Sequence, residues 1–121
     1  MYENEIKNLN EFLRKELWMD FEMCSIGRGK IELHGFLDEA DDDMVIITFE
    51  SPYMVDCVFF FTYEGKGDFI SIIDGEEAYR VNRKYDITKG NILFKLSNTN
   101  ISTDMIIVAE KISIRIAGCE S

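Results

Sequence analysis

The chain has 121 residues, 46% of them hydrophobic, and a formal net charge of −10 at pH 7. This length matches about one average domain, and the apolar fraction exceeds that of a disordered chain, so we expect a single folded domain over residues 1–121. The negative charge argues against binding to nucleic acid or to an anionic membrane surface, because both kinds of binding need Lys and Arg on the protein.

The ends and the cysteines of the chain indicate its compartment. Cys24, Cys57 and Cys119 form no C-x-x-C pair, and an odd number of thiols cannot all close into disulfides. Glu3 and Glu5 stand where a signal peptide would carry positive charge, and no stretch reaches the roughly 18 apolar residues of a membrane helix. We therefore predict a reduced, cytoplasmic protein that needs no cofactor to fold.

The first element in chain order is an amphipathic helix, which we predict over residues 4–19 with Asn4 as its N-cap. Its apolar side chains recur at steps of three and four residues, at Ile6, Leu9, Leu13 and Leu17. We expect this apolar face to pack on a sheet.

After residue 20 the apolar pattern changes to the alternation that is typical of strands. About eight strands are predicted, at residues 30–37, 44–49, 55–63, 69–73, 78–81, 91–96, 105–108 and 111–116. The links between them are short, which favours antiparallel neighbours, and Pro52 is expected to separate the second strand from the third. No second helix is predicted. The expected fold is α+β, mostly β: the helix packs on a strongly curved antiparallel sheet, either a half-open barrel or a two-layer sandwich.

The most apolar run of the chain is Val58 to Phe61. We expect these four side chains to lie in the core. The alternative is a surface through which two copies join along their strand edges.

His34 is the only histidine, so any catalytic pair with Cys24 or Cys57 as nucleophile would have to use it. On an alternating strand it shares a face with Glu32 and Phe36, which predicts a structural role. A pocket inside the curved sheet, with His34 and Glu32 among its lining residues, is the enzymatic alternative. No pair of ligands at zinc-site spacing accompanies the histidine.

The densest charged run lies between the first two predicted strands. Its five acids are Asp38, Glu39, Asp41, Asp42 and Asp43. They predict a solvated hairpin turn, and carboxylate oxygens could also hold Ca²⁺, although the run departs from the EF-hand pattern. A third hypothesis is that this turn inserts into a basic cleft of a protein partner, so these five acids are the candidate partner-binding residues.

Charge is distributed unevenly along the chain. Residues 1–77 carry 6 basic and 19 acidic side chains, whereas residues 78–100 carry 5 basic side chains and one acid. The second range contains Tyr79 to Tyr85, where aromatic and basic residues alternate as they do in single-strand nucleic-acid sites. The net charge of the protein opposes that function, and the sequence leaves open whether this range forms a basic patch.

The order of these segments resembles that of small acidic immunity proteins, which neutralise bacterial polymorphic toxins. The helix leads into Trp18 to Ile26, followed by Lys30 to Leu37, Met44 to Glu50 and Asp56 to Phe61. Many such domains begin their first strand with Asp-Ser-x-Ile, and this chain has Asp20-Phe21-Glu22 there. The resemblance implies a protein without catalytic activity that binds and blocks a basic toxin, such as a nuclease.

Three functional hypotheses follow. The first is a non-catalytic protein-binding module that contacts a basic protein through an acidic surface. The second is an assembly domain that forms a homodimer, and the third is a ligand or enzymatic pocket near His34.

Overall fold

The structure is a computed structural model that describes residues 2–16, 18–27, 29–37, 44–64, 67–97 and 105–117. Its elements are α1 (Glu3–Glu16), β1 (Met19–Gly27), β2 (Lys30–Phe36), β3 (Val45–Asp56), β4 (Phe60–Tyr63), β5 (Ile70–Ile72), α2 (Gly75–Tyr85), β6 (Ile92–Leu96) and β7 (Met105–Ile116).

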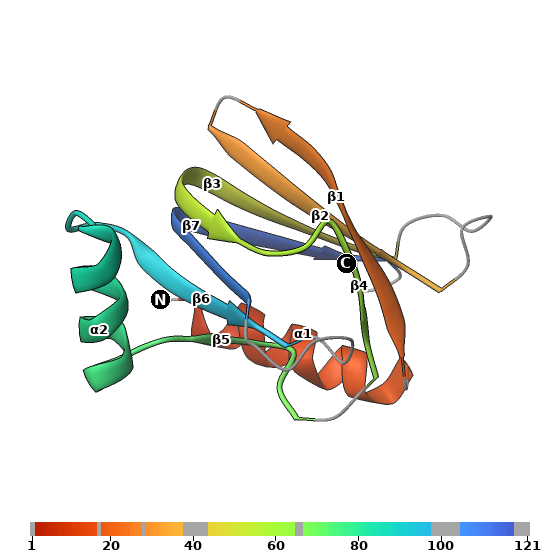
Figure 1. Cartoon of the computed structure of the whole chain (residues 1–121). Helices are drawn as coiled ribbons and strands as arrows, with labels where there is room; N and C mark the ends of the chain where they lie inside the picture. The colour runs from red at the N-terminus through yellow and green to blue at the C-terminus, as the bar shows by residue number, and fades with distance from the viewer. Residues whose placement is uncertain are drawn as a thin grey trace.

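All the strands belong to one antiparallel sheet in the order β4-β1-β2-β3-β7-β6-β5. The sheet curls into a half-barrel and α1 packs against its inner face (Figure 1). This arrangement confirms the expected α+β, mostly β fold with an N-terminal helix on a strongly curved sheet.

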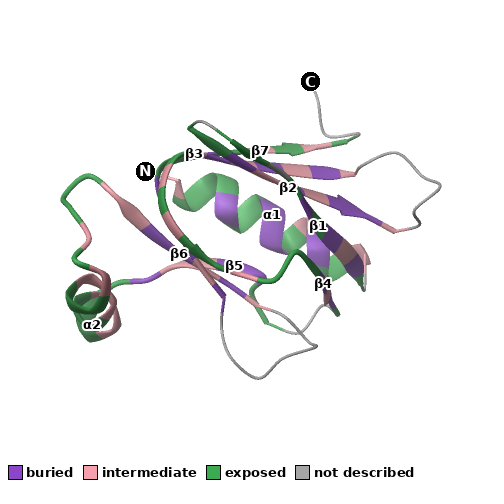
Figure 2. Cartoon of the chain, turned by 45° about the horizontal axis from the view of Figure 1, so that its top comes forward, coloured by how far each residue is buried: buried purple, intermediate pink, exposed green. Residues whose placement is uncertain are grey.

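The main core lies between α1 and the inner face of the sheet. Ile6, Leu9 and Leu13 of α1 are buried there, as the helical periodicity predicts. The helix contributes one buried stripe and is exposed on its other side (Figure 2). The helix begins at Glu3, so Asn4 lies in the first turn and is not the cap. Aromatic rings fill much of the interior, with the Phe21 and Phe69 centroids 4.5 Å apart.

Strand β3 contains an irregularity near its middle. Ser51 has a φ of 53°, and the pairing of β3 with β7 shifts register between Pro52 and Met54. Such bulges bend a strand and increase its twist, and they tolerate a proline, which has no N–H to donate. The expectation that Pro52 ends a strand is therefore wrong, because β3 continues to Asp56.

The predicted strand at residues 78–81 is also wrong, because these residues lie within α2. The expectation of no second helix fails with it. Ala78 and Val81 pack on a small cluster of Ile73, Leu93 and Val108 at one end of the outer face of the sheet. A sequence signal for this helix exists: an Asp-Gly-Glu-Glu start opens the segment and a basic last turn closes it, which is typical of helix ends.

Other predicted boundaries also differ from the structure. The helix predicted over residues 4–19 ends at Glu16, and Met19–Gly27 forms β1, where no strand is predicted. The run at residues 55–63 is divided between the end of β3 and β4, while residues 105–108 and 111–116 form one continuous strand, β7. Alternation along the chain does not reveal these boundaries, because they depend on which strand lies alongside.

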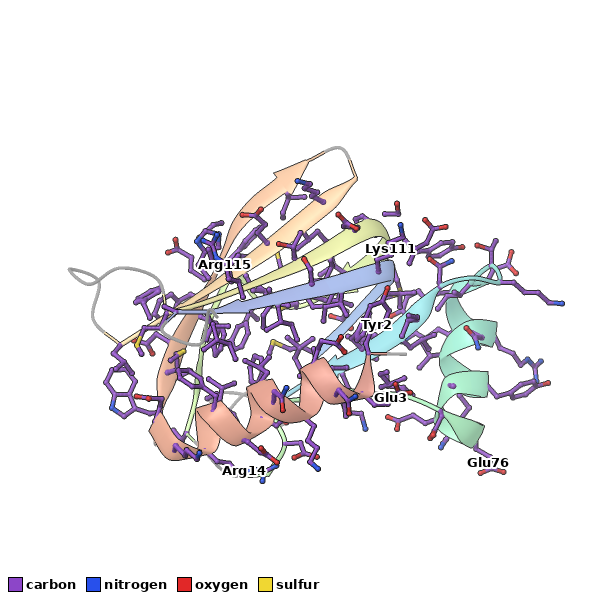
Figure 3. The ribbon with its side chains drawn as sticks, turned by 180° about the vertical axis from the view of Figure 1, so that it is seen from behind. Tyr2, Glu3, Arg14, Glu76, Lys111 and Arg115 are labelled. Carbon is purple, nitrogen blue, oxygen red and sulfur yellow. The ribbon has the colours of Figure 1, made fainter. Side chains whose placement is uncertain are left out.

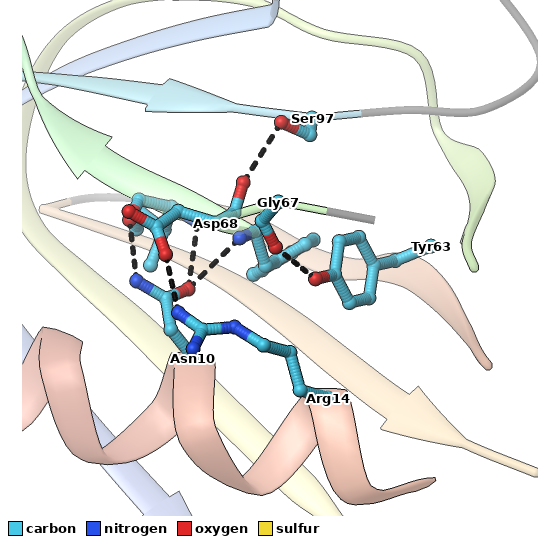
Figure 4. Close-up of polar contacts among 8 residues, drawn as sticks. Asn10, Arg14, Tyr63, Gly67, Asp68 and Ser97 are labelled. Carbon is cyan, nitrogen blue, oxygen red and sulfur yellow. Dashed lines mark hydrogen bonds and ion pairs between the residues drawn. The ribbon is translucent and has the colours of Figure 1, made fainter. Parts of the chain in front are cut away.

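The β5 edge of the sheet is closed by a side chain of α1. The Ile73 amide donates to the Leu93 carbonyl, and the Ser97 amide donates to the Phe69 carbonyl. In an antiparallel pair every second residue bonds to the neighbouring strand, so the N–H and C=O groups of Ile70, next to Phe69, point away from β6. Asn10, only 4% exposed, bonds to them: its Nδ2 donates to the Ile70 carbonyl at 2.9 Å, and its Oδ1 accepts from the Ile70 amide at 3.0 Å. The same oxygen accepts from the Phe69 amide at 2.9 Å (Figure 4). One buried amide thus replaces the missing neighbouring strand at this point.

Candidate functional site

An exposed apolar segment joins β3 to β4. It consists of Val55, Val58, Phe59 and Phe60, and we call it the β3–β4 apolar segment. Phe59 is 66% exposed and Phe60 48% exposed, whereas the next residue, Phe61, is 1% exposed. The sequence-based expectation that Val58 to Phe61 all lie in the core is therefore wrong for the first three residues. In Figure 2 the ribbon between β3 and β4 is coloured mainly as exposed.

Pairing with β1 holds the segment in a defined position. The amide of Met23 donates to the carbonyl of Phe59 at 2.8 Å, and Glu22 is directly opposite Phe60 in the β1–β4 register. On the inner face, Phe61 stacks on Phe21 with ring centroids 5.5 Å apart. The alternation of strand side chains thus buries Phe61 and directs Phe60 to the outer face. The exposed rings are attached to an ordered strand pair.

The strands beside these rings carry acidic side chains. Residues 18–27 and 55–64 contain four acids, Asp20, Glu22, Asp56 and Glu64, and no Lys or Arg. His34, on the neighbouring strand β2, lies directly opposite Glu22 and beside Glu32. An apolar surface with an acidic border suits a partner that presents apolar groups surrounded by positive charge.

His34 lies on the outer face of the sheet, directly opposite Glu22 on β1 and Ile46 on β3. Its Nε2 is 3.0 Å from Oε1 of Glu32, and the ring is partly buried. The interior of the curl is on the opposite side, and it is filled with apolar side chains such as Leu33. The structure thus places His34 and Glu32 on the same face of β2, as the alternation predicts. This face is the outside of the curl, whereas the pocket hypothesis places both side chains inside it.

The five acids of the predicted partner-binding turn, Asp38, Glu39, Asp41, Asp42 and Asp43, lie outside the described residues. Their role as contacts for a basic partner stays a prediction from the sequence.

The basic residues at 78–100 are divided between α2 and other elements, and Lys95 of β6 forms an ion pair with Glu77 at the start of α2. Arg83 and Lys84 form the last turn of the helix, while Glu76 and Glu77 lie in its first turn, an order that matches the helix dipole. The Arg83 guanidinium lies 5.7 Å from the centre of the Tyr79 ring. Helix stabilisation accounts for this charge pattern without a nucleic-acid strand. Figures 1 and 2 place α2 at the opposite end of the molecule from β1 and β4.

Cys57 is the better buried of the two cysteines that the structure describes. Its Sγ is 3.5 Å from Sδ of Met105, and Cys24 is exposed. Burial, with a smaller contribution from the Asp56 charge, raises the pKa of the Cys57 thiol to about 12, so the nucleophilic thiolate is scarce at neutral pH. Among the residues that the structure describes, no three His, Cys, Asp or Glu side chains are grouped closely enough to hold a metal ion.

Neither helix of the described ranges is long and apolar enough to cross a membrane. Comparison of the chain with protein-family models, with curated proteins and with solved structures finds no match.

Proposed function

We propose that this protein is a non-catalytic, cytoplasmic protein-binding module, and that its partner is a basic protein such as a toxin that it neutralises. The observation that carries this proposal is the exposure of Phe59 and Phe60 on an ordered strand pair. Aromatic side chains commonly dominate the binding energy of interaction sites, and exposed apolar surface is a common feature of such sites.

The negative charge of the molecule supports a basic partner. Asp20 and Glu22 lie on β1, which pairs with β4, Asp56 ends β3, and the chain as a whole has a charge of −10. Opposite charges across an interface speed the encounter of two proteins and disfavour wrong partners. The acidic turn at residues 38–43 would add to this attraction.

A homodimer through the same apolar segment is the second candidate. Its two copies would each bring a charge of −10 and the same acidic border to the interface, so their repulsion opposes it. We therefore favour a different, basic protein as the partner. Light scattering of the purified chain at high concentration tests this choice, with a monomer expected.

Binding to the protein encoded by the adjacent gene, where that protein is basic, tests the proposal. We expect calorimetry to show a 1:1 complex, and Phe59→Ser to weaken it about tenfold or more, as loss of a central aromatic contact does. The matched control is Tyr79→Ser, because Tyr79 is 62% exposed but lies on α2. Equal affinities for the two variants, or no binding by the wild-type chain, would contradict the proposal.

A further inference from the structure

Two aromatic rings meet on the outer face of the sheet above β1. Phe60 comes from β4 and Phe36 from β2, the two strands that flank β1. Their centroids are 6.2 Å apart with an interplanar angle of 55°. Phe36 is buried and supports one side of Phe60, which leaves part of the Phe60 ring open to solvent.

The strand between these rings carries carboxylates on the same face. Glu22 is directly opposite Phe60, and Asp20 is directly opposite Phe36 and Thr62. Side chains at such opposed positions have their Cβ atoms about 4.5–5.5 Å apart. The Thr62 hydroxyl donates to Oδ1 of Asp20 at 2.6 Å, which orients that carboxylate. Neither carboxylate takes part in the ion pairs found between described residues, and the Cys24 thiol lies 3.5 Å from Oε1 of Glu22.

An exposed ring face next to a carboxylate recognises one type of basic side chain better than another. A guanidinium is planar and weakly hydrated, so it stacks on an aromatic ring while its N–H groups bond a carboxylate. The ammonium group of lysine holds its water more strongly and has no flat face to stack.

We infer that the basic partner places an arginine side chain on Phe60, with its guanidinium bonded to Glu22. This inference rests on the proposed protein-binding function and specifies the chemistry of the contact. Asp20, fixed by Thr62, adds negative charge on the neighbouring position of β1, and Phe36 holds the Phe60 ring from behind.

A six-residue arginine peptide and a six-residue lysine peptide, each titrated into the full chain, test the inference. We expect the arginine peptide to bind about threefold or more tighter, and Phe60→Leu to remove this preference because it keeps apolar bulk but not the ring. Tyr79→Leu on α2 is the matched control and should leave the preference unchanged. Circular dichroism confirms that each variant is folded.

The carboxylate is tested in the same way. Glu22→Gln should weaken binding of the arginine peptide about fivefold or more, because it removes a charge-assisted hydrogen bond. Glu76→Gln removes the same charge from the first turn of α2, at the far end of the molecule (Figure 3), and should change the affinity less than about twofold.

Two results would overturn the inference: equal affinity for the two peptides, or equal losses from Glu22→Gln and Glu76→Gln. The second result would mean that the peptide responds to the total charge alone. Because the protein-binding proposal is tested separately by Phe59→Ser with a protein partner, it can hold while the arginine contact fails.

Discussion

At one edge of the sheet, α1 lies beside β5 and Asn10 bonds the outward backbone groups of Ile70. At the other edge, β4 carries Phe60 on its outer face and follows directly after Phe59, the most exposed of the large apolar side chains that the structure describes. The first edge is covered by the protein's own helix. The second edge carries apolar side chains that stay exposed to solvent in the folded protein.

This difference supports the proposed binding surface beside β4. Proteins commonly cover or shorten sheet edges, because an open edge invites association with other chains. The β5 edge follows that rule with a three-residue strand and a buried amide. The β4 edge strand is also short, with four residues, and its distinguishing feature is the exposed apolar side chains of Phe59 and Phe60, which are expected at a binding surface rather than at a structural one.

The largest expected effect contrasts two neighbouring phenylalanines. Phe61→Ala should lower the free energy of unfolding by about 3–5 kcal/mol, since it empties a core position against Phe21 and Phe69. Phe59→Ala should change it by less than about 0.5 kcal/mol because the ring is exposed. Urea unfolding of both variants measures the difference. Similar losses would show that Phe59 belongs to the core and would remove the contrast between the edges.

An intermediate effect is expected from opening the β5 edge. Asn10→Ala should cost about 2–4 kcal/mol, because the Phe69 amide and both backbone groups of Ile70 lose a buried hydrogen-bond partner. Asn8→Ala, an exposed position on the same helix, is the control and should be nearly neutral. Urea unfolding again gives the values. A neutral Asn10→Ala variant would mean that the edge does not depend on this side chain.

The smallest of the three effects concerns β1, the strand that supports the β3–β4 apolar segment. A Cβ on Gly35 would lie 2.8 Å from both Met19 Sδ and Phe21 Cε1, so Gly35→Ala should cost about 1–3 kcal/mol through overpacking. Gly27→Ala is the control, because nothing lies within 4 Å of its Cβ position. Thermal unfolding compares the two variants. If both have the same stability, β1 does not need this close approach to β2.

Much of the fold could be predicted because periodicity is a local property. The three- and four-residue steps of Ile6, Leu9 and Leu13 predict α1, and these side chains are buried. The alternation of Ile31 and Leu33 with polar neighbours predicts β2 and its inner face. Both predictions need only the geometry of one element.

The second helix carries signals of both kinds in its sequence. Its Asp-Gly-Glu-Glu start and basic last turn indicate a helix, whereas the short apolar pattern of Ala78 and Val81 predicts a strand. The helix has no fully buried residue, and its apolar side is recognised only once Leu93 and Val108 lie beneath it.

The site proposed from the structure differs from the one predicted from the sequence, whose five acids at residues 38–43 lie outside the described residues. Acidity as the dominant surface charge follows from composition, and the structure locates four acids on the segments around the exposed rings. The exposure of Phe59 and Phe60 could not be predicted, since hydrophobicity alone assigns them to the core with Phe61.

By itself the sequence determined the class of fold, the amphipathic helix and the negative charge. Composition is a sum over residues, and periodicity depends only on residues that are close together in the chain. Only the tertiary structure decided that α1 covers the β5 edge, that β3 continues through Pro52, and that two of three consecutive phenylalanines face water. The physical reason is that the burial of a side chain depends on which residues, distant in the sequence, pack against it. Phe61 meets Phe21 and Phe69, while Phe59 has no such covering layer among the described residues.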